Sequence, residues 1–109
     1  MIAFSALADP TRLHIVELLA LNGRLPAKQI SKHFTASPPA ISQHLKVLKQ
    51  ANLVQVEVNG QQRIYSLNPQ GITEIEQWIS KMRDLWEHRF NTLEQLLVEE
   101  LKAELDAEE

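Results

Sequence analysis

The clearest alternation of apolar and polar positions lies within residues 37–50. At about 100° per residue, with Ile41 set at 0°, Leu45 and Leu48 fall within about 40° of it on a helical wheel. These three side chains are therefore predicted to pack into a core. The opposite side of the same helix carries small and polar residues, namely Pro39, Gln43, Lys46 and Gln50. The pattern predicts an amphipathic helix with a polar outer face.

Two helices are predicted before it. The first starts at Asp9-Pro10, where Asp caps the free amides and Pro takes the first helical position, and it ends at Asn22-Gly23. Its predicted apolar face is wide: it consists of Leu13, Val16 and Ala20, flanked by Ile15, Leu18 and Leu19. The preceding residues, 1–8, are mostly apolar and are expected to form a helical turn or two packed against a partner chain.

The second predicted helix opens at Leu25-Pro26 and places Ala27, Ile30 and Phe34 on one face. Residues 35–37 then form a three-residue turn, and Ser37 caps the amphipathic helix with Pro38 in its first position. Two helices joined by so short a turn form a helix-turn-helix motif.

Two short strand-like runs follow, over residues 54–58 and 63–67, around the turn signal Asn59-Gly60. The expected fold is therefore mainly α. It is a winged helix-turn-helix with a two-stranded β-hairpin wing, spanning residues 9–67, followed by a long helix over residues 72–105.

That last helix has apolar residues every three or four positions from Ile75 to Leu105, with no Pro or Gly after Gly71. So long a stripe exceeds what one small domain covers, so we expect a homodimer, although part of the stripe packs within the chain. The predicted dimer contacts are Phe4, Ile75, Ile79, Met82, Trp86, Phe90, Leu93 and Leu97. An effector pocket between subunits is a second, less favoured interpretation of Trp78, Trp86 and Phe90.

Charge is divided unevenly along the 109 residues, whose net charge is −3. Residues 1–66 carry +4 and residues 67–109 carry −7, so the half that contains the helix-turn-helix is suited to phosphate. The absence of cysteine removes disulfides and thiolate metal sites. With no membrane-length apolar run and no signal-peptide pattern, a cytoplasmic protein is expected.

Taken together, the segments Ala8–Leu19 and Ile41–Val54, with the hairpin after them, resemble the ArsR family of bacterial winged-helix repressors. The resemblance runs from about Leu7 to Leu67. It implies a dimer that binds a two-fold operator in double-stranded DNA, with recognition helices in successive major grooves. It also implies a bacterial protein that is nucleoid-associated when bound to DNA, and it raises the question of an inducer, a small molecule or a protein. The segment Trp86–Leu97 resembles a non-metal branch of that family, often encoded beside START-like (SRPBCC) proteins.

Metal-sensing members of the family carry a Cys-Val-Cys motif where this chain has Pro26, Ala27 and Lys28. A second family site is likewise unmatched, since residues 68–72 contain no ligand pair. We therefore expect no metal and no other cofactor. A ligand role stays open for the four histidines, His14, His33, His44 and His88. His44 lies beside the core stripe and is expected to be a packed imidazole; Asp84 and His88 are expected to be a surface pair rather than half of an intersubunit site.

Gln43 and Lys46 are the predicted base and groove contacts, because Gln pairs with adenine and Lys with guanine or phosphate. Hydroxyls can bind phosphate, small apolar groups can meet a thymine methyl, and an arginine on the wing can reach the backbone or minor groove. The full predicted DNA-binding set is Ser37, Pro38, Pro39, Ala40, Ser42, Gln43, Lys46, Gln62 and Arg63.

Neither a phosphate loop, nor a nucleophile elbow, nor a zinc-protease helix occurs, so an enzyme is not expected. The function predicted from sequence is a homodimeric repressor, with its own promoter as one candidate target. Two alternatives stay open: a protein-interaction module that docks through the winged helix and the acidic helix, and a metal sensor with an unrecognised site.

Overall fold

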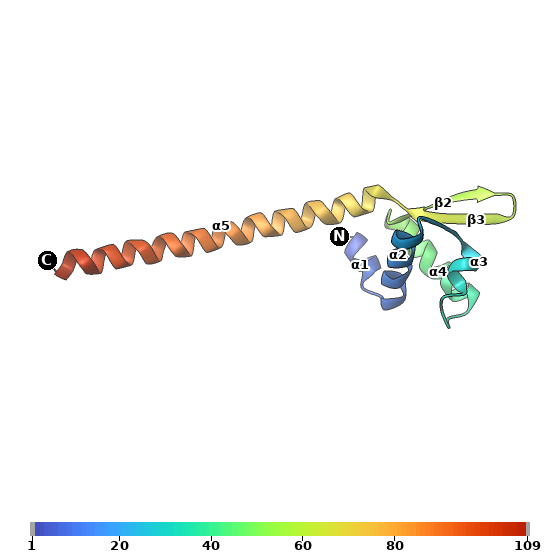
Figure 1. Ribbon diagram of the computed structural model, residues 1–109, viewed down its shortest axis with the longest axis horizontal. Coiled ribbons are helices and arrows are strands. Elements are labelled where there is room, and N and C mark those ends of the chain that lie inside the picture. Colours follow the sequence, from blue (N-terminus) through green and yellow to red (C-terminus); the bar gives the residue numbers. More distant parts are fainter. Residues whose placement is uncertain (1, 109) are drawn as a thin grey trace. The chain divides into compact units, whose positions relative to one another are not determined.

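The computed structural model describes residues 2–108, in two compact units that divide between Ile75 and Glu76. The first unit holds all elements but most of the last helix, in the order shown in Figure 1. These elements are α1 (Ile2–Leu7), α2 (Pro10–Asn22), β1 (Arg24–Pro26), α3 (Ala27–Ser31), α4 (Pro38–Gln50), β2 (Val54–Asn59), β3 (Gln62–Leu67) and the start of α5 (Pro69–Glu108).

The core of the first unit forms around α4, as its pattern predicts. Ile41, Leu45 and Leu48 are at most 1% exposed, while Pro39, Gln43, Lys46 and Gln50 on the outer face are all exposed. The helices α1, α2 and α3 supply most of the opposing core, together with the start of β2. The remaining core side chains are Ala3, Ala6, Ile15, Leu19, Ile30, Ala51, Leu53, Val54 and Tyr65.

The predicted start and end of α2 are confirmed, and its predicted wide apolar face is confirmed only at part of its positions. The Asp9 carboxylate accepts a hydrogen bond from the Arg12 amide at 3.0 Å, and Gly23 ends the helix at φ 81°. The buried positions are Ile15 and Leu19, whereas Leu13 is 43% exposed and Ala20 is also exposed. Apolar residues occur on every side of α2, so their spacing alone does not select a face.

The sheet has three strands rather than the two of a simple hairpin wing. Its order is β1-β3-β2, with both pairs antiparallel. The segment at Leu25-Pro26, predicted to open a helix, instead forms edge strand β1, in which Leu25 pairs with Tyr65 and Pro26 with Ile64. An edge strand tolerates proline because one side of it needs no hydrogen-bond partners. Consequently α3 is only five residues long, and residues 32–37, not three residues, connect it to α4.

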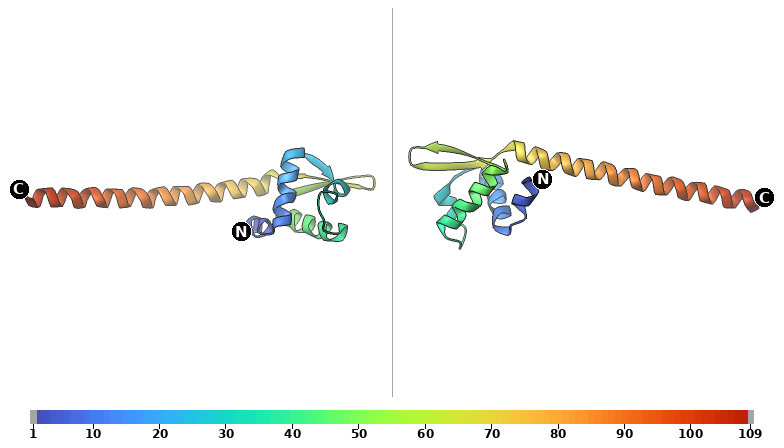
Figure 2. Two further views of the ribbon diagram at one scale, coloured as in Figure 1. Left: turned by 60° about the horizontal axis from the view of Figure 1, so that its bottom comes forward. Right: turned by 180° about the vertical axis from the view of Figure 1, so that it is seen from behind.

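The β2–β3 hairpin is confirmed, with its turn one residue later than predicted. Asn59 pairs with Gln62 as the last step of the ladder, so the loop is Gly60-Gln61. Gly60 has φ 63°, a left-handed conformation that favours glycine at the first position of a two-residue hairpin turn. Both views of Figure 2 show the hairpin tip extending beyond the helices of this unit.

Helix α5 begins at Pro69, earlier than the predicted residue 72, and continues to Glu108. The side-chain oxygen of Asn68 accepts a hydrogen bond from the Gln70 amide at 3.0 Å, which supports the first turn. Gly71 lies in the first turn of the helix, where its amide donates a hydrogen bond to the carbonyl oxygen of Asn52 at 2.9 Å. A Cβ atom on Gly71 would lie 2.4 Å from that oxygen. The glycine therefore marks a close backbone approach and not a break.

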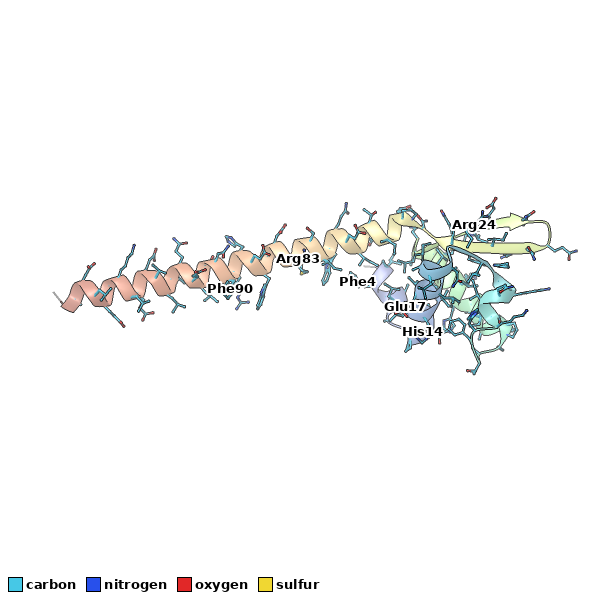
Figure 3. All side chains as sticks on the ribbon, in the orientation of Figure 1. Phe4, His14, Glu17, Arg24, Arg83 and Phe90 are labelled. Atoms are coloured by element: carbon cyan, nitrogen blue, oxygen red, sulfur yellow. The ribbon has the colours of Figure 1, made fainter. Side chains whose placement is uncertain are left out.

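The second unit is a single helical segment of α5. Every side chain from residue 83 to residue 107 is exposed, including Trp86 at 68% and Phe90 at 59%. Figure 3 labels Arg83 and Phe90 on this helix. Of the predicted dimer contacts, Ile75 packs against the core of the first unit and Phe4 and Met82 are partly buried; the others are exposed.

The predicted N-terminal helical segment is confirmed as α1, with Ala3 and Ala6 facing the core. Met1, included in that prediction, lies outside the described residues. None of the helices within residues 2–108 combines the length and the apolar character needed to cross a membrane.

Candidate nucleic-acid interface

A groove of about 500 Å³ runs between α4 and the β2–β3 hairpin. Five of the predicted DNA-binding residues line it together: Pro39, Ser42, Gln43, Lys46 and Arg63. The other lining residues are Ala27, Lys49, Val56 and Tyr65. The first four of the predicted residues come from one helix and Arg63 from β3, so the fold brings together two regions that are separated in sequence.

The start of α4 is held by its cap. The Ser37 hydroxyl oxygen accepts a hydrogen bond from the Ala40 amide at 3.3 Å, and Pro38 occupies the first turn. The hydroxyl proton of Ser37 is left available for an external acceptor. Ser37, Pro38 and Ala40 do not line the groove, and they lie at the end of α4 beside it.

The groove is cationic. Its charged lining consists of Lys46, Lys49 and Arg63, and no acidic side chain of the described chain lines it. On the adjoining strands, Arg24 forms an exposed ion pair with Glu57, which links β1 to β2 across β3; Figure 3 shows Arg24 beside the strands. A Gln- and Lys-bearing helix beside the hairpin residue Arg63 offers positive charge and hydrogen-bond donors to phosphates and base edges.

The remaining predicted wing residue, Gln62, lies on a neighbouring surface. It lines a second groove of about 450 Å³ with Pro26, Lys28, Gln61 and Arg63. Arg63 belongs to both grooves, so the hairpin joins them at this side chain.

Sequence reasoning missed Lys49 and Tyr65 as groove residues. Lys49 is seven positions after Ser42, and seven residues are about two helical turns, so both lie along one strip of α4. That spacing could have predicted Lys49 as a groove residue. No sequence pattern predicts Tyr65 there, because it is 6% exposed and its position depends on the strand register.

His44 faces α2 rather than the groove, in keeping with the predicted packed imidazole. Its Nδ1 lies 3.4 Å from Arg12 Nη1 and 3.8 Å from a carboxylate oxygen of Asp9. Arg12 Nε also donates to the Ala6 carbonyl at 2.6 Å, so one guanidinium contacts both α1 and α4. The backbone hydrogen bond from the Arg12 amide, helped by the charges of His44 and Arg12, lowers the pKa of Asp9 below its ordinary value of 3.8.

Two of the other histidines have ordinary structural neighbours, and the third, His88, is exposed on α5. The His14 and Phe34 rings lie 6.4 Å apart, and His33 Nδ1 lies 2.9 Å from the Gln29 carbonyl oxygen. Across residues 2–108, no three His, Asp or Glu side chains come close enough together to hold a metal ion. The expectation of no metal stays a prediction.

Comparison with known proteins agrees with this geometry. The model of the family described as "Bacterial regulatory protein, arsR family" matches residues 9–56. The chain is 47% identical over 73 residues to the HTH-type transcriptional regulator Rv2034 of Mycobacterium tuberculosis, covering 67% of each chain. It is 41% identical over 76 residues to the transcriptional repressor SdpR of Bacillus subtilis, covering 70% of this chain and 83% of the relative.

Solved structures show the same fold. A possible transcriptional regulator for arsenical resistance superposes with a TM-score of 0.69 at 36% identity, over 75% of this chain and 84% of the other. A homodimeric winged helix-turn-helix DNA-binding domain from Mycobacterium bovis superposes with a TM-score of 0.61 at 24% identity, over 76% of each chain.

Proposed function

Because the chain belongs to the arsR family of bacterial regulatory proteins, we propose that it is a homodimeric repressor that binds a two-fold DNA operator. It is a regulator and not an enzyme. Its recognition helix is α4, and each protomer places α4 in one of two successive major grooves. The promoter of its own gene is the first candidate target.

One observation carries the proposal: the groove between α4 and the hairpin. It gathers Gln43, Lys46, Lys49 and Arg63 with no acidic residue in its described lining. Gln43 and Lys46 are exposed on the outer face of α4, where a B-DNA major groove about 12 Å wide admits a helix. At the start of α4, Ser37 and Pro38 flank this surface, with Ser37 as a proposed phosphate contact, and Ala40 is a proposed contact to a thymine methyl. On the wing, Gln62 and Arg63 are proposed contacts to the backbone or minor groove.

The proposed dimer rests on the second unit. Its predicted contacts, Ile79, Trp86, Phe90, Leu93 and Leu97, are all more than 40% exposed in the single chain. So large an apolar surface on one helix marks an interaction site, and a self-complementary contact between two copies covers it in both. Met82, which is partly buried, extends this surface, and Phe4 of the first unit is a separate proposed dimer contact.

We further propose that DNA release does not depend on a metal bound at the Cys-Val-Cys motif of metal-sensing relatives. This chain has Pro26, Ala27 and Lys28 at the matching positions. An inducer that binds only one arrangement of the dimer shifts the population toward it. Release follows if that arrangement spaces the two α4 helices differently from the operator half-sites.

The test is a fluorescence-anisotropy titration of the purified protein against DNA from upstream of its own gene and against a scrambled duplex, each at two salt concentrations. We expect tighter binding to the upstream DNA, weakening steeply as salt rises because phosphate contacts release counterions. Sedimentation velocity on the same sample measures the oligomeric state.

Equal, weak binding to both duplexes would remove autoregulation and direct the search to operator selection from genomic DNA. A folded dimer that binds neither duplex nor any selected sequence would contradict the repressor function and favour the protein-docking alternative. Calorimetric binding of zinc or nickel tighter than micromolar, at one ion per protomer or per dimer, would overturn the absence of a metal site.

A further inference from the structure

A third groove, of about 510 Å³, lies between α3 and α4. Its volume falls within the range of about 300–1,000 Å³ typical of small-molecule sites. The floor is apolar: Ile41 and Leu45 belong to the core, and Phe34 and Ala36 from the connecting segment line the groove beside them. Figure 1 shows α3 and α4 next to each other in this unit.

The only charged side chains in this lining, within the described chain, are Lys28 and Lys32. They are four residues apart along α3 and its C-cap, so they lie on one face of that turn. Both are exposed, and neither belongs to the ion pairs of the described residues, Arg24–Glu57 and His44–Asp9. Two cations beside an apolar floor complement a ligand with an apolar body and one anionic group.

We propose that this groove binds a small apolar carboxylate, whose carboxylate pairs with Lys28 and Lys32 while its hydrocarbon part covers Phe34 and Ala36. The proposal rests on the proposed DNA-binding function in one respect: the ligand is an inducer that weakens operator binding. Burial of the apolar part supplies most of the affinity, and the lysines select the anion.

The link to DNA is the shared wall between the two grooves. Ala27 and Ser42 line both, and Pro38, in the first turn of α4, lines the carboxylate groove. A bound ligand therefore lies against the N-terminal end of the recognition helix. Its single negative charge also offsets part of the positive charge of Lys28 and Lys32 beside the proposed DNA surface, and both effects oppose DNA binding.

Isothermal titration calorimetry of the full chain without DNA tests binding directly, with 4-phenylbutyrate as the probe and neutral 4-phenylbutanol as its matched control. We expect one saturable site per protomer for the carboxylate and much weaker binding of the alcohol. Exposed ion pairs are modest, so each lysine removed weakens the carboxylate about threefold, and K28Q with K32Q about tenfold.

Two further variants localise the site. Ala36→Phe fills the groove and is expected to abolish binding; because it alters a packed segment, its fold is checked by circular dichroism. K46Q with K49Q removes two lysines from the neighbouring groove instead, and it should bind 4-phenylbutyrate as the unmodified chain does. Equal affinity of the unmodified chain, K28Q with K32Q and Ala36→Phe would place the probe elsewhere, for example on the aromatic residues of α5, and would overturn the proposal.

A separate arm adds 4-phenylbutyrate to the protein–DNA anisotropy assay, where a rise in the Kd for DNA is expected in the unmodified chain and a smaller one in K28Q with K32Q. Absence of calorimetric binding overturns the groove proposal whether or not DNA binds. Probe binding that leaves the Kd for DNA unchanged overturns the inducer role. Probe binding by a protein that binds no DNA contradicts the proposed function and leaves the carboxylate site standing.

Discussion

The two units of this chain treat the same kinds of apolar side chain in opposite ways. In the first unit, Leu45 and Leu48 are at most 1% exposed; in the second, Leu93 and Leu97 are 53% and 60% exposed. Leucines at helical spacing therefore form a buried core within the chain in the first unit, whereas in the second unit they form an exposed apolar surface. The difference lies in what surrounds each helix: α4 is enclosed by three helices and a sheet, whereas the second unit has only its own helical segment.

The largest loss of stability in the first unit is expected from truncating the buried side chain of Leu48. Leu48→Ala removes a fully buried side chain and leaves a cavity, so we expect a loss of about 2–5 kcal/mol in the free energy of unfolding. Urea unfolding followed by circular dichroism measures it. Leu21, which is 85% exposed, provides the matched control: Leu21→Ala should change that free energy by no more than about 0.5 kcal/mol. Similar losses in both variants would contradict the assigned core.

On the second unit, a double change of Trp86→Ala with Phe90→Ala should act on association rather than on folding. Two exposed aromatic side chains per protomer are removed from the proposed dimer surface, and we expect the dimer dissociation constant to rise about 100-fold or more. Sedimentation equilibrium measures it, with Glu87→Ala on the same helix as the control. A dimer as tight as before would mean that the two copies meet through another surface.

Gly71→Ala tests the place where α5 is fixed to the first unit's own backbone. In an exposed helix the change would stabilise by up to about 1 kcal/mol. Here the new Cβ would lie 2.4 Å from the Asn52 carbonyl oxygen, so we expect destabilisation of about 1–3 kcal/mol. Thermal and urea unfolding measure the change, with Gln70→Ala as the neighbouring control. A stabilised Gly71→Ala variant would show that this approach is easily relieved.

Within the first unit, substitutions on the outer face of α4 should change DNA recognition without changing the free energy of unfolding. Gln43→Ala is expected to relax base preference at one operator position, at a cost of about 1–3 kcal/mol. Anisotropy with single-base operator variants measures it. Arg63→Ala is the counterpart: as a change at the DNA backbone it should weaken all sequences alike and reduce the salt slope by about 0.9 for each phosphate that is no longer neutralised. An unchanged preference at every position would remove Gln43 from the base contacts.

The smallest expected effect is the loss of stability at low pH when the Asp9 cap of α2 is protonated. The pKa of Asp9 is lowered in the folded chain, chiefly by the Arg12 amide. Its charge-dependent stabilisation is therefore complete above the ordinary value of 3.8 and disappears as pH falls below it through the folded value. The urea midpoint of the unmodified chain should exceed that of Asp9→Asn at pH 6 by a margin that shrinks toward pH 2. A margin independent of pH would contradict this assignment.

Sequence alone predicted the parts of the fold in which local pattern and packing coincide. The inner face of α4, the caps at Asp9 and Ser37, and the β2–β3 hairpin each depend on short-range spacing. The helix α2 was harder, because apolar residues on all its sides leave Ile15 and Leu19 undistinguished until the neighbouring elements are placed.

The features that sequence did not predict depend on contacts between distant residues. Strand β1 is three residues long and exists because Leu25 and Pro26 pair with β3, a register that no local pattern encodes. A glycine at position 71 predicts that α5 begins after it. In the structure Gly71 lies inside α5, where it leaves room for the Asn52 carbonyl oxygen. For the same reason, Lys49 and Tyr65 could be assigned to the groove only once α4 and the hairpin were seen together.

The division at Ile75 also has a consequence for the order of synthesis. Every core side chain of the first unit lies at or before Ile75, so no residue of the second unit is needed to complete that core. Domains that emerge first fold first. The apolar stripe of the second unit then emerges from an already folded neighbour and meets its counterpart only when another finished chain is near. Assembly of the proposed dimer should therefore be a bimolecular step that follows folding, and its rate should rise with the concentration of finished chains.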